Sequence, residues 1–402
     1  MTTPELAATE LAVTRTAGVT TPAGFRAAGV AAGIKVSGAP DLTLVVNEGP
    51  SDAAAAVFTT NKVKAAPVLW SQQAVSDNRL RAVVLNSGGA NACTGPEGFQ
   101  DTHRTAEHVA EVLKISAVDV AVCSTGLIGE RLPMDAVLSG VDRAAQALAA
   151  TETAGLDAAT AVMTTDTHPK QSALTHPAGF SIGGFVKGAG MLAPNMATML
   201  SVITTDAVVE PARLDAILKA TTKVTYDRLD VDGGTSTNDT VLVLASGASG
   251  VAPSEEDFAE ALRAVCHDLV RQLQGDAEGV TKEVAVTVRG AATEQDAVTV
   301  ARAIARDSLV KTAFFGSDPN WGRILMALGN APAHVEADKI DVTLNGVLVC
   351  QGGTRAADRE GADLSGRDIE VLIDLHVGDA AATVLTTDLS HGYVEENSAY
   401  SS

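Results

Sequence analysis

Short apolar runs, glycine-rich turns and amphipathic repeats alternate along the whole chain. Runs rich in β-branched residues predict strands at 43–46, 54–58, 82–85, 118–123 and 180–186, with a further strand-like run at 198–205. The same pattern predicts strands at 240–245, 283–288, 340–344, 347–350, 370–375 and 382–386. Helical spacing predicts helices at 101–113, 133–149, 211–222, 255–274, 294–306 and 319–328. The Asn345-Gly346 turn implies a hairpin, so we expect an α/β protein with mixed sheets covered by helices.

Two glycine-rich turns follow predicted strands in the first half of the chain. They span residues 86–96 and 124–129, and both contain small residues that leave backbone N–H groups accessible. In the second turn, Thr125 and Gly126 supply a hydroxyl and an amide that suit the stabilisation of an oxyanion. From the pattern alone an ordinary strand-to-helix turn is the favoured interpretation, since a helix is predicted from residue 133.

The stretch 183–206 lies at the middle of the chain and joins a glycine-rich loop to an apolar strand. Thr198 stands at the junction, after the small side chain of Ala197. If the chain were cleaved before Thr198, the new α-amino group would titrate near ~7.7 to 8.0 and would act as a base for its own hydroxyl. Threonine is also common at strand starts, so spacing alone leaves both interpretations open.

Other polar segments are weaker candidates. The loop 164–170 contains Asp166 and His168 and looks too polar for a core, which makes it either a ligand contact or a plain loop. The loop 230–239 does not have the spacing of a calcium loop, so we expect a structural or substrate-facing turn. His103, Glu107 and Glu111 share one helix face but lack the HExxH order, which favours a solvated face over a metal site. The tail 395–402 is expected to be disordered.

Composition and charge narrow the class of protein. Hydrophobic residues make up 46% of the 402 residues, which is typical of a globular protein. The formal net charge of -20 disfavours nucleic acid and anionic membranes as partners. The 4 cysteines form no CxxC pair, and no run approaches the ~20 apolar residues of a membrane-spanning helix. We therefore expect a cytoplasmic protein.

Three segments together resemble the ornithine acetyltransferase family of arginine biosynthesis. They are residues 187–200, which read KGAGMLAPNMATML, residues 124–129, which read STGLIG, and residues 318–323, which read DPNWGR. The resemblance covers essentially the full length, and the first motif is long and specific. It departs from the family pattern at Gly89, where Asn is usual, and at Gly234, where Asp is common.

The resemblance implies that the chain cleaves itself between Ala197 and Thr198, giving an α chain, 1–197, and a β chain, 198–402. It implies an acetyltransferase that moves the acetyl group from N2-acetyl-L-ornithine to L-glutamate, with no cofactor and no metal. Thr198 would be the nucleophile, with its new α-amino group as base, and Thr125 and Gly126 the oxyanion hole. The implied substrate-binding positions are Thr164, Lys187, Thr198, Glu278, Asn397 and Ser402.

The resemblance also implies the architecture. The expected fold is a layered αββα sandwich similar to N-terminal-nucleophile hydrolases, with a smaller α/β domain near the C-terminus. We expect the main domain at 1–280 and the smaller one at 281–402, with the tail returning to the site and an α2β2 or larger assembly. Three alternatives stay open: a bifunctional enzyme that also acetylates glutamate from acetyl-CoA, a self-processing amidase or aminopeptidase, and a binding protein without activity.

Overall fold

The computed structural model describes residues 11–193, 199–357 and 361–399, and their named strands form three sheets. The first sheet has the order β1-β2-β4-β5, with β1 Phe25–Val30, β2 Leu42–Asn47, β4 Ala82–Ser87 and β5 Val120–Thr125. The second has the order β3-β9-β8-β7-β6, with β3 Ala53–Phe58, β9 Thr240–Ala245, β8 Leu200–Thr205, β7 Phe180–Lys187 and β6 Lys170–His176. Only β4 with β5 and β8 with β9 pair in parallel within these two sheets, so the expectation of mixed connectivity is confirmed for the described residues.

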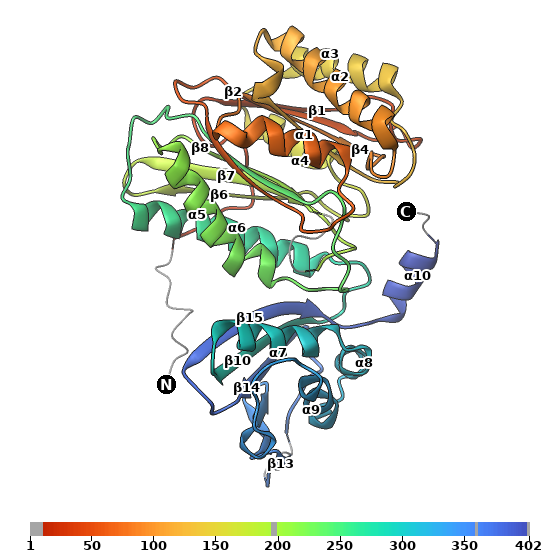
Figure 1. The fold of residues 1–402 in the computed structure, drawn as a ribbon, viewed down its shortest axis with the longest axis vertical. Helices are drawn as coiled ribbons and strands as arrows, with labels where there is room; N and C mark the ends of the chain where they lie inside the picture. The colour runs from red at the N-terminus through yellow and green to blue at the C-terminus, as the bar shows by residue number, and fades with distance from the viewer. Residues whose placement is uncertain (1–10, 194–198, 358–360, 400–402) are drawn as a thin grey trace.

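The first two sheets pack face to face (Figure 1). Alternate residues of facing strands, such as Val45 of β2 and Val202 of β8, fill the layer between them. The helices α1 (Ala66–Ala74) and α4 (Glu152–Ala161) contribute Ala74 and Ala158 to the same layer. Burial on both faces explains why these strands read as nearly continuous apolar runs rather than as alternating patterns.

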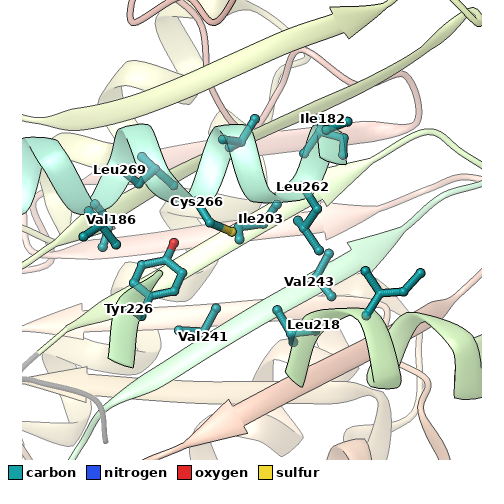
Figure 2. Packing of buried hydrophobic residues seen from close by; sticks show 14 of the residues in the cluster. Ile182, Val186, Ile203, Leu218, Tyr226, Val241, Val243, Leu262, Cys266 and Leu269 are labelled. Atoms are coloured by element: carbon teal, nitrogen blue, oxygen red, sulfur yellow. The ribbon is translucent and has the colours of Figure 1, made fainter. Parts of the chain in front are cut away.

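Helices cover both outer faces of this pair of sheets. α2 (Gly95–Leu113) and α3 (Met134–Ala147) pack on the first sheet. α5 (Pro211–Val224) and α6 (Glu255–Gly275) pack on the second. Figure 2 shows this second contact, where Leu262, Cys266 and Leu269 of α6 lie over strand residues that include Ile203 and Val243. The four layers confirm the predicted αββα sandwich.

The third sheet has the order β13-β12-β11-β14-β10-β15 and forms the lower body in Figure 1. Its strands are β10 Glu283–Ala291, β11 Asp341–Leu344, β12 Val347–Gln351, β13 Thr354–Arg355, β14 Asp368–Asp374 and β15 Ala380–Thr387. The helices α7 (Glu294–Arg306), α8 (Ser308–Phe315) and α9 (Trp321–Gly329) cover its apolar face. After β15 the chain leaves this body through α10 (His391–Ala399), toward the first two sheets (Figure 1).

Several predicted elements are shifted in the structure. α2 begins at Gly95 rather than at residue 101, because Pro96 occupies a first-turn position in which its missing N–H costs nothing. α9 begins at Trp321 rather than at 319, since the Asn320 side chain caps it by accepting from Arg323 N. The strand expected at 118–123 lies at 120–125, after a 3-10 turn at Ala117–Asp119. Among the described helices, none is long and apolar enough to cross a membrane.

Candidate active site

A cavity of about 110 Å³ opens where β5 and β7 end and where β8 and β9 begin. Its position follows from the pairing, since the antiparallel β7 and β8 bring Lys187 opposite Leu200. The cavity is lined by Ala90, Thr125, Gly126, Ile128, Thr164, Thr165, Lys187, Gly190, Met191, Ser236, Thr237, Asn238, Glu278 and Asn397. Every implied site residue within the described ranges is therefore brought to one cavity. Ala197, Thr198 and Ser402 lie outside the described residues.

The turn after β5 fixes the peptide between Thr125 and Gly126. The Thr125 carbonyl accepts hydrogen bonds from Gly88 N at 2.9 Å and Gly89 N at 3.0 Å. Because a trans peptide points its C=O and N–H in opposite directions, the Gly126 N–H faces away from these amides. Gly126 has φ +128, and a Cβ there would lie 2.5 Å from Gly89 N, so only glycine fits. The turn thus presents an oriented amide at the cavity.

Lys187 is buried beside this turn, with 1% of its surface exposed. Its Nζ donates to Thr164 Oγ1 at 2.8 Å and to Thr125 Oγ1 at 3.3 Å. Because Thr125 Oγ1 accepts from the ammonium group, its own proton remains available for another acceptor. Burial lowers the pKa of Lys187, and the nearby Asp166 carboxylate opposes that effect.

A series of buried ion pairs lies next to Lys187. Asp166 Oδ1 accepts from Lys170 Nζ and from Gly188 N, both at 2.7 Å, and Lys170 Nζ also lies 2.5 Å from Asp276 Oδ2. Burial alone would raise the pKa of Asp166, but Lys187 and Lys170 outweigh it and hold that pKa well below its ordinary range. The view that the loop 164–170 is too polar for a core was wrong for Asp166 and Lys170, which are buried because they pair.

Glu278 places a carboxylate on the cavity wall. Its Oε1 accepts from Thr165 Oγ1 at 2.8 Å, and its Oε2 accepts from Asn397 Nδ2 at 2.9 Å. Gly190 lies directly against it, since a Cβ there would be 2.3 Å from Oε2. The cavity therefore combines an oriented amide, a hydroxyl, a buried ammonium group and a half-buried carboxylate. Such a set is suited to a small zwitterionic ligand that reacts at a carbonyl group.

Asn397 comes from a helix, not from a disordered tail. The expectation of disorder at 395–402 was wrong for residues 395–399, which belong to α10. The sequence did not predict this helix because it has no apolar repeat, which agrees with the finding that none of its described residues is buried. Ser390 Oγ donates to Gly279 O and accepts from Tyr393 N at 3.1 Å, which anchors the start of the helix next to Glu278.

Comparison with known proteins identifies the family of this chain. The sequence model of the ArgJ family matches residues 26–402. This chain belongs to the ArgJ family. It is 62% identical to the "Arginine biosynthesis bifunctional protein ArgJ" of Mycolicibacterium paratuberculosis over 393 residues, covering 96% of this chain and 97% of that protein.

Two further proteins are similar in sequence to this chain. The ArgJ protein of Mycobacterium leprae is 62% identical over 398 residues, which is 98% of each chain. The crystal structure of ornithine acetyltransferase complexed with ornithine from Mycobacterium tuberculosis is 62% identical. That match covers 46% of this chain and 97% of the solved one, with a TM-score of 0.45.

Three neighbouring polar residues that line the cavity were not predicted as site residues from the sequence. Ser236, Thr237 and Asn238 line the wall, within the loop predicted only as a structural or substrate-facing turn. Their signal is a run of small hydroxyl and amide side chains directly before a buried strand, because such residues at a strand end are placed to contact a ligand or a neighbouring turn. The next residue, Asp239, is fully buried and accepts from Met199 N at 3.1 Å, and burial raises its pKa well above the ordinary value.

Other polar groups of this family member stand apart from the cavity. His103 and Glu107 lie 3.8 Å apart on the surface of α2, both about half exposed. Within the described ranges, no group of three or more His, Cys, Asp or Glu residues is arranged to hold a metal ion. His168 is exposed and lies 3.3 Å from Asp276 Oδ1, at the outer end of the buried ion pairs.

Proposed function

We propose that this chain is an acetyltransferase of arginine biosynthesis that moves an acetyl group from N2-acetyl-L-ornithine to L-glutamate after cleaving itself before Thr198. The observation that carries the proposal is the meeting of Thr125, Gly126 and Lys187 at the point where β8 begins, directly after the Thr198-Met199 segment. Membership of the ArgJ family supports the same reaction.

The first step of the proposed mechanism is self-cleavage. The Thr198 hydroxyl attacks the Ala197 carbonyl, the peptide C–N bond breaks, and the chain is joined through an ester. Water then hydrolyses the ester, which leaves a carboxylate on Ala197 and a free α-amino group on Thr198. At neutral pH part of this amine is unprotonated and can take the proton of its own hydroxyl.

The second step is acetyl transfer. Thr198 Oγ1 attacks the acetyl carbonyl, and the negative oxygen that forms accepts from Gly126 N–H and from the Thr125 hydroxyl, whose proton is available. The C–N bond to ornithine breaks and its amine leaves with a proton. The amine of L-glutamate then attacks the acetyl-Thr198 ester and regenerates the free hydroxyl.

Charge complementarity supports the proposed substrate contacts. Lys187 pairs with an α-carboxylate, and Glu278 accepts from the side-chain ammonium of ornithine, each as a charge-assisted hydrogen bond. Lys187 Nζ lies 2.8 Å from Thr164 Oγ1, and Glu278 Oε2 lies 2.9 Å from Asn397 Nδ2, so both charged groups have fixed positions. In this proposal Thr198 and Ser402 complete the set of binding residues.

Intact mass spectrometry tests the proposal. We expect wild-type protein to consist of chains 1–197 and 198–402, and Thr198→Ala to remain one inactive chain. Thr299→Ala, which changes a threonine on α7 far from the cavity, is the matched control and should cleave normally. Steady-state rates with acetylornithine and glutamate should follow a ping-pong pattern. An uncleaved Thr198→Ala protein that still transfers acetyl groups would overturn the mechanism.

A second activity is favoured by the name of the two relatives, "Arginine biosynthesis bifunctional protein ArgJ". We propose as the alternative that acetyl-CoA also acetylates Thr198, so that glutamate is acetylated without acetylornithine. The test uses acetyl-CoA as sole donor. N-acetylglutamate formed by wild type and lost in Thr198→Ala would establish the activity, and no product above background would exclude it.

The assembly, the domain division and the location of the protein are part of the same proposal. We propose an α2β2 or larger assembly, tested by light scattering on the cleaved protein. We propose domains at 1–280 and 281–402, tested by limited proteolysis near residue 280. A cytoplasmic location fits the proposed pathway and is tested by cell fractionation.

A further inference from the structure

We propose that Asn238 is a positioning residue that sets the orientation of the oxyanion donors on the Thr125–Gly126 turn. The inference rests on the proposed function, because it assigns a task to a residue that neither attacks nor binds the substrate in the mechanism above. Its basis is a set of hydrogen bonds that join the loop before β9 to both glycine-rich turns.

Every polar atom of the Asn238 side chain is engaged. Its Nδ2 donates to Ala90 O at 2.6 Å and to Ser124 O at 2.8 Å, and its Oδ1 accepts from Thr237 Oγ1 at 2.6 Å. Because two carbonyl groups face one end of the amide, the amide has one favourable orientation. The side chain is 4% exposed, so these bonds are largely shielded from competing water.

The two carbonyl groups bound by Asn238 belong to the segments that hold the oxyanion donors. Ser124 O is the carbonyl directly before Thr125, while Ala90 follows the two glycines whose amides hold the Thr125 carbonyl. The side chain of Asn86 links the same two turns a second time. Ser124 Oγ donates to Asn86 Oδ1 at 2.6 Å, and Asn86 Nδ2 donates to Gly89 O at 3.0 Å. The peptide that carries the Gly126 N–H is therefore held at its own carbonyl, Thr125 O, by Gly88 and Gly89, and at the preceding carbonyl, Ser124 O, by Asn238.

The residue after Asn238, Asp239, contacts the chain directly after the proposed nucleophile. Asp239 Oδ1 accepts from Met199 N, the amide that directly follows Thr198. One dipeptide thus contacts the oxyanion turn through its first side chain and the start of β8 through its second. Because a misplacement of about 1 Å in a reacting geometry can cost about 100-fold in rate, a clamp between these two elements sets the rate of attack rather than the affinity for substrate.

Isosteric and truncating variants test this role. Asn238→Asp removes the donor and keeps the shape, while Asn238→Ala removes the side chain. We expect both to slow self-cleavage and the acetylation of Thr198 by about 100-fold, with KM for acetylornithine little changed. The measurements are the cleaved fraction against time and the single-turnover acetylation rate per cleaved chain, both by intact mass. A variant that remains stable but uncleaved also supports the proposal, because cleavage needs the same donors.

Asn47 provides the matched control. It is 2% exposed and is the last residue of β2, whereas the first residue, Leu42, pairs with Asn86 beside the cavity. Like Asn238, it binds two backbone groups, Ser51 O and Gly49 N, both at 3.0 Å. Asn47→Asp and Asn47→Ala should lower Tm at least as much and leave both rates unchanged. Asn238 variants that cleave and acetylate at the wild-type rate, or no more slowly than Asn47 variants of equal Tm, would overturn the inference. If wild-type protein neither cleaves nor transfers acetyl groups, the proposed function itself fails.

Discussion

At the scale of single residues, the contact between Gly190 and Glu278 controls how the cavity presents its carboxylate. A Cβ at position 190 would meet Glu278 Oε2 at 2.3 Å and Cδ at 2.5 Å. Gly190→Ala must therefore displace the carboxylate from Thr165 and Asn397. Loss of a charge-assisted contact costs about 1.5 to 3 kcal/mol, so we expect KM for acetylornithine to rise tenfold or more.

The control for this substitution is Gly329→Ala at the end of α9, where no atom lies within 4 Å of the added methyl group. It should leave KM unchanged. Steady-state assays of both variants with a fixed level of glutamate make the comparison. An unchanged KM in Gly190→Ala would show that Glu278 does not bind the donor substrate.

Some residues could be placed from the sequence and others could not. Thr125, Lys187 and Glu278 were assigned to one site through the family resemblance, and the structure brings them to one cavity. Asp166 and Lys170 were not recognised as buried, because a sequence shows the cost of burying a charge but not the partner that offsets it. The role of Asn238 could not be predicted for a related reason, since both of its acceptors are backbone carbonyls distant in sequence.

At the scale of elements, prediction succeeded where the apolar pattern was strong. α7 was predicted at its observed bounds, 294–306, because Thr293 caps its start and apolar residues recur along one face. α4 was missed because alanine and glycine form much of its buried face, which gives no clear apolar repeat. β6 was missed because it begins with the buried polar residues Lys170 and Gln171.

Helix α10 should contribute to binding rather than to folding. Since none of its described residues is buried, we expect Asn397→Ala to leave Tm unchanged. The substitution removes the Asn397 donor from Glu278 and should raise KM for acetylornithine by about threefold to tenfold, because a hydrogen bond to a charged group is weakened when it is exposed to water. Steady-state kinetics and thermal unfolding measure the two effects.

Glu396→Ala is the matched control for α10, because Glu396 is exposed on the same helix and does not line the cavity. It should change neither KM nor Tm. A fall of several degrees in Tm for Asn397→Ala, without a change in KM, would instead assign α10 a structural role.

At the scale of the whole molecule, the third sheet supports the segment that leads into the cavity wall. Asp230 N donates to Leu385 O of β15 at 2.8 Å, and Asp230 Oδ2 accepts from Arg306 Nε of α7 at 2.6 Å. Arg302 donates to Asp227 O at 2.9 Å, which adds a second bond from α7. Because residues 236–238 follow this segment closely, the lower body in Figure 1 helps to fix the wall of a cavity that it does not line.

Asp230 should make the stability of the fold depend on pH. Burial raises its pKa to about 6 from an ordinary value of 3.8, even though Arg306 lowers it in part, and its Oδ1 has no hydrogen-bond partner among the described residues. A carboxyl group with a raised pKa in the folded state stabilises the fold most below about pH 4, and this contribution is lost as the pH rises through about 6. The loss amounts to about 3 kcal/mol at most.

Asp230→Asn keeps the shape and the acceptor for Arg306 but cannot ionise. We therefore expect Tm of this variant to rise relative to wild type as the pH increases from 4 to 7, with most of the change between pH 4 and 6. Asp338→Asn, at an exposed position, should show a constant difference from wild type over the same range. Thermal unfolding at each pH makes the comparison, and taking differences between proteins removes the contribution of all other titrating groups. A constant difference for Asp230→Asn would mean that Arg306 keeps Asp230 ionised throughout, so that the contact between the third sheet and the cavity wall is a permanent ion pair.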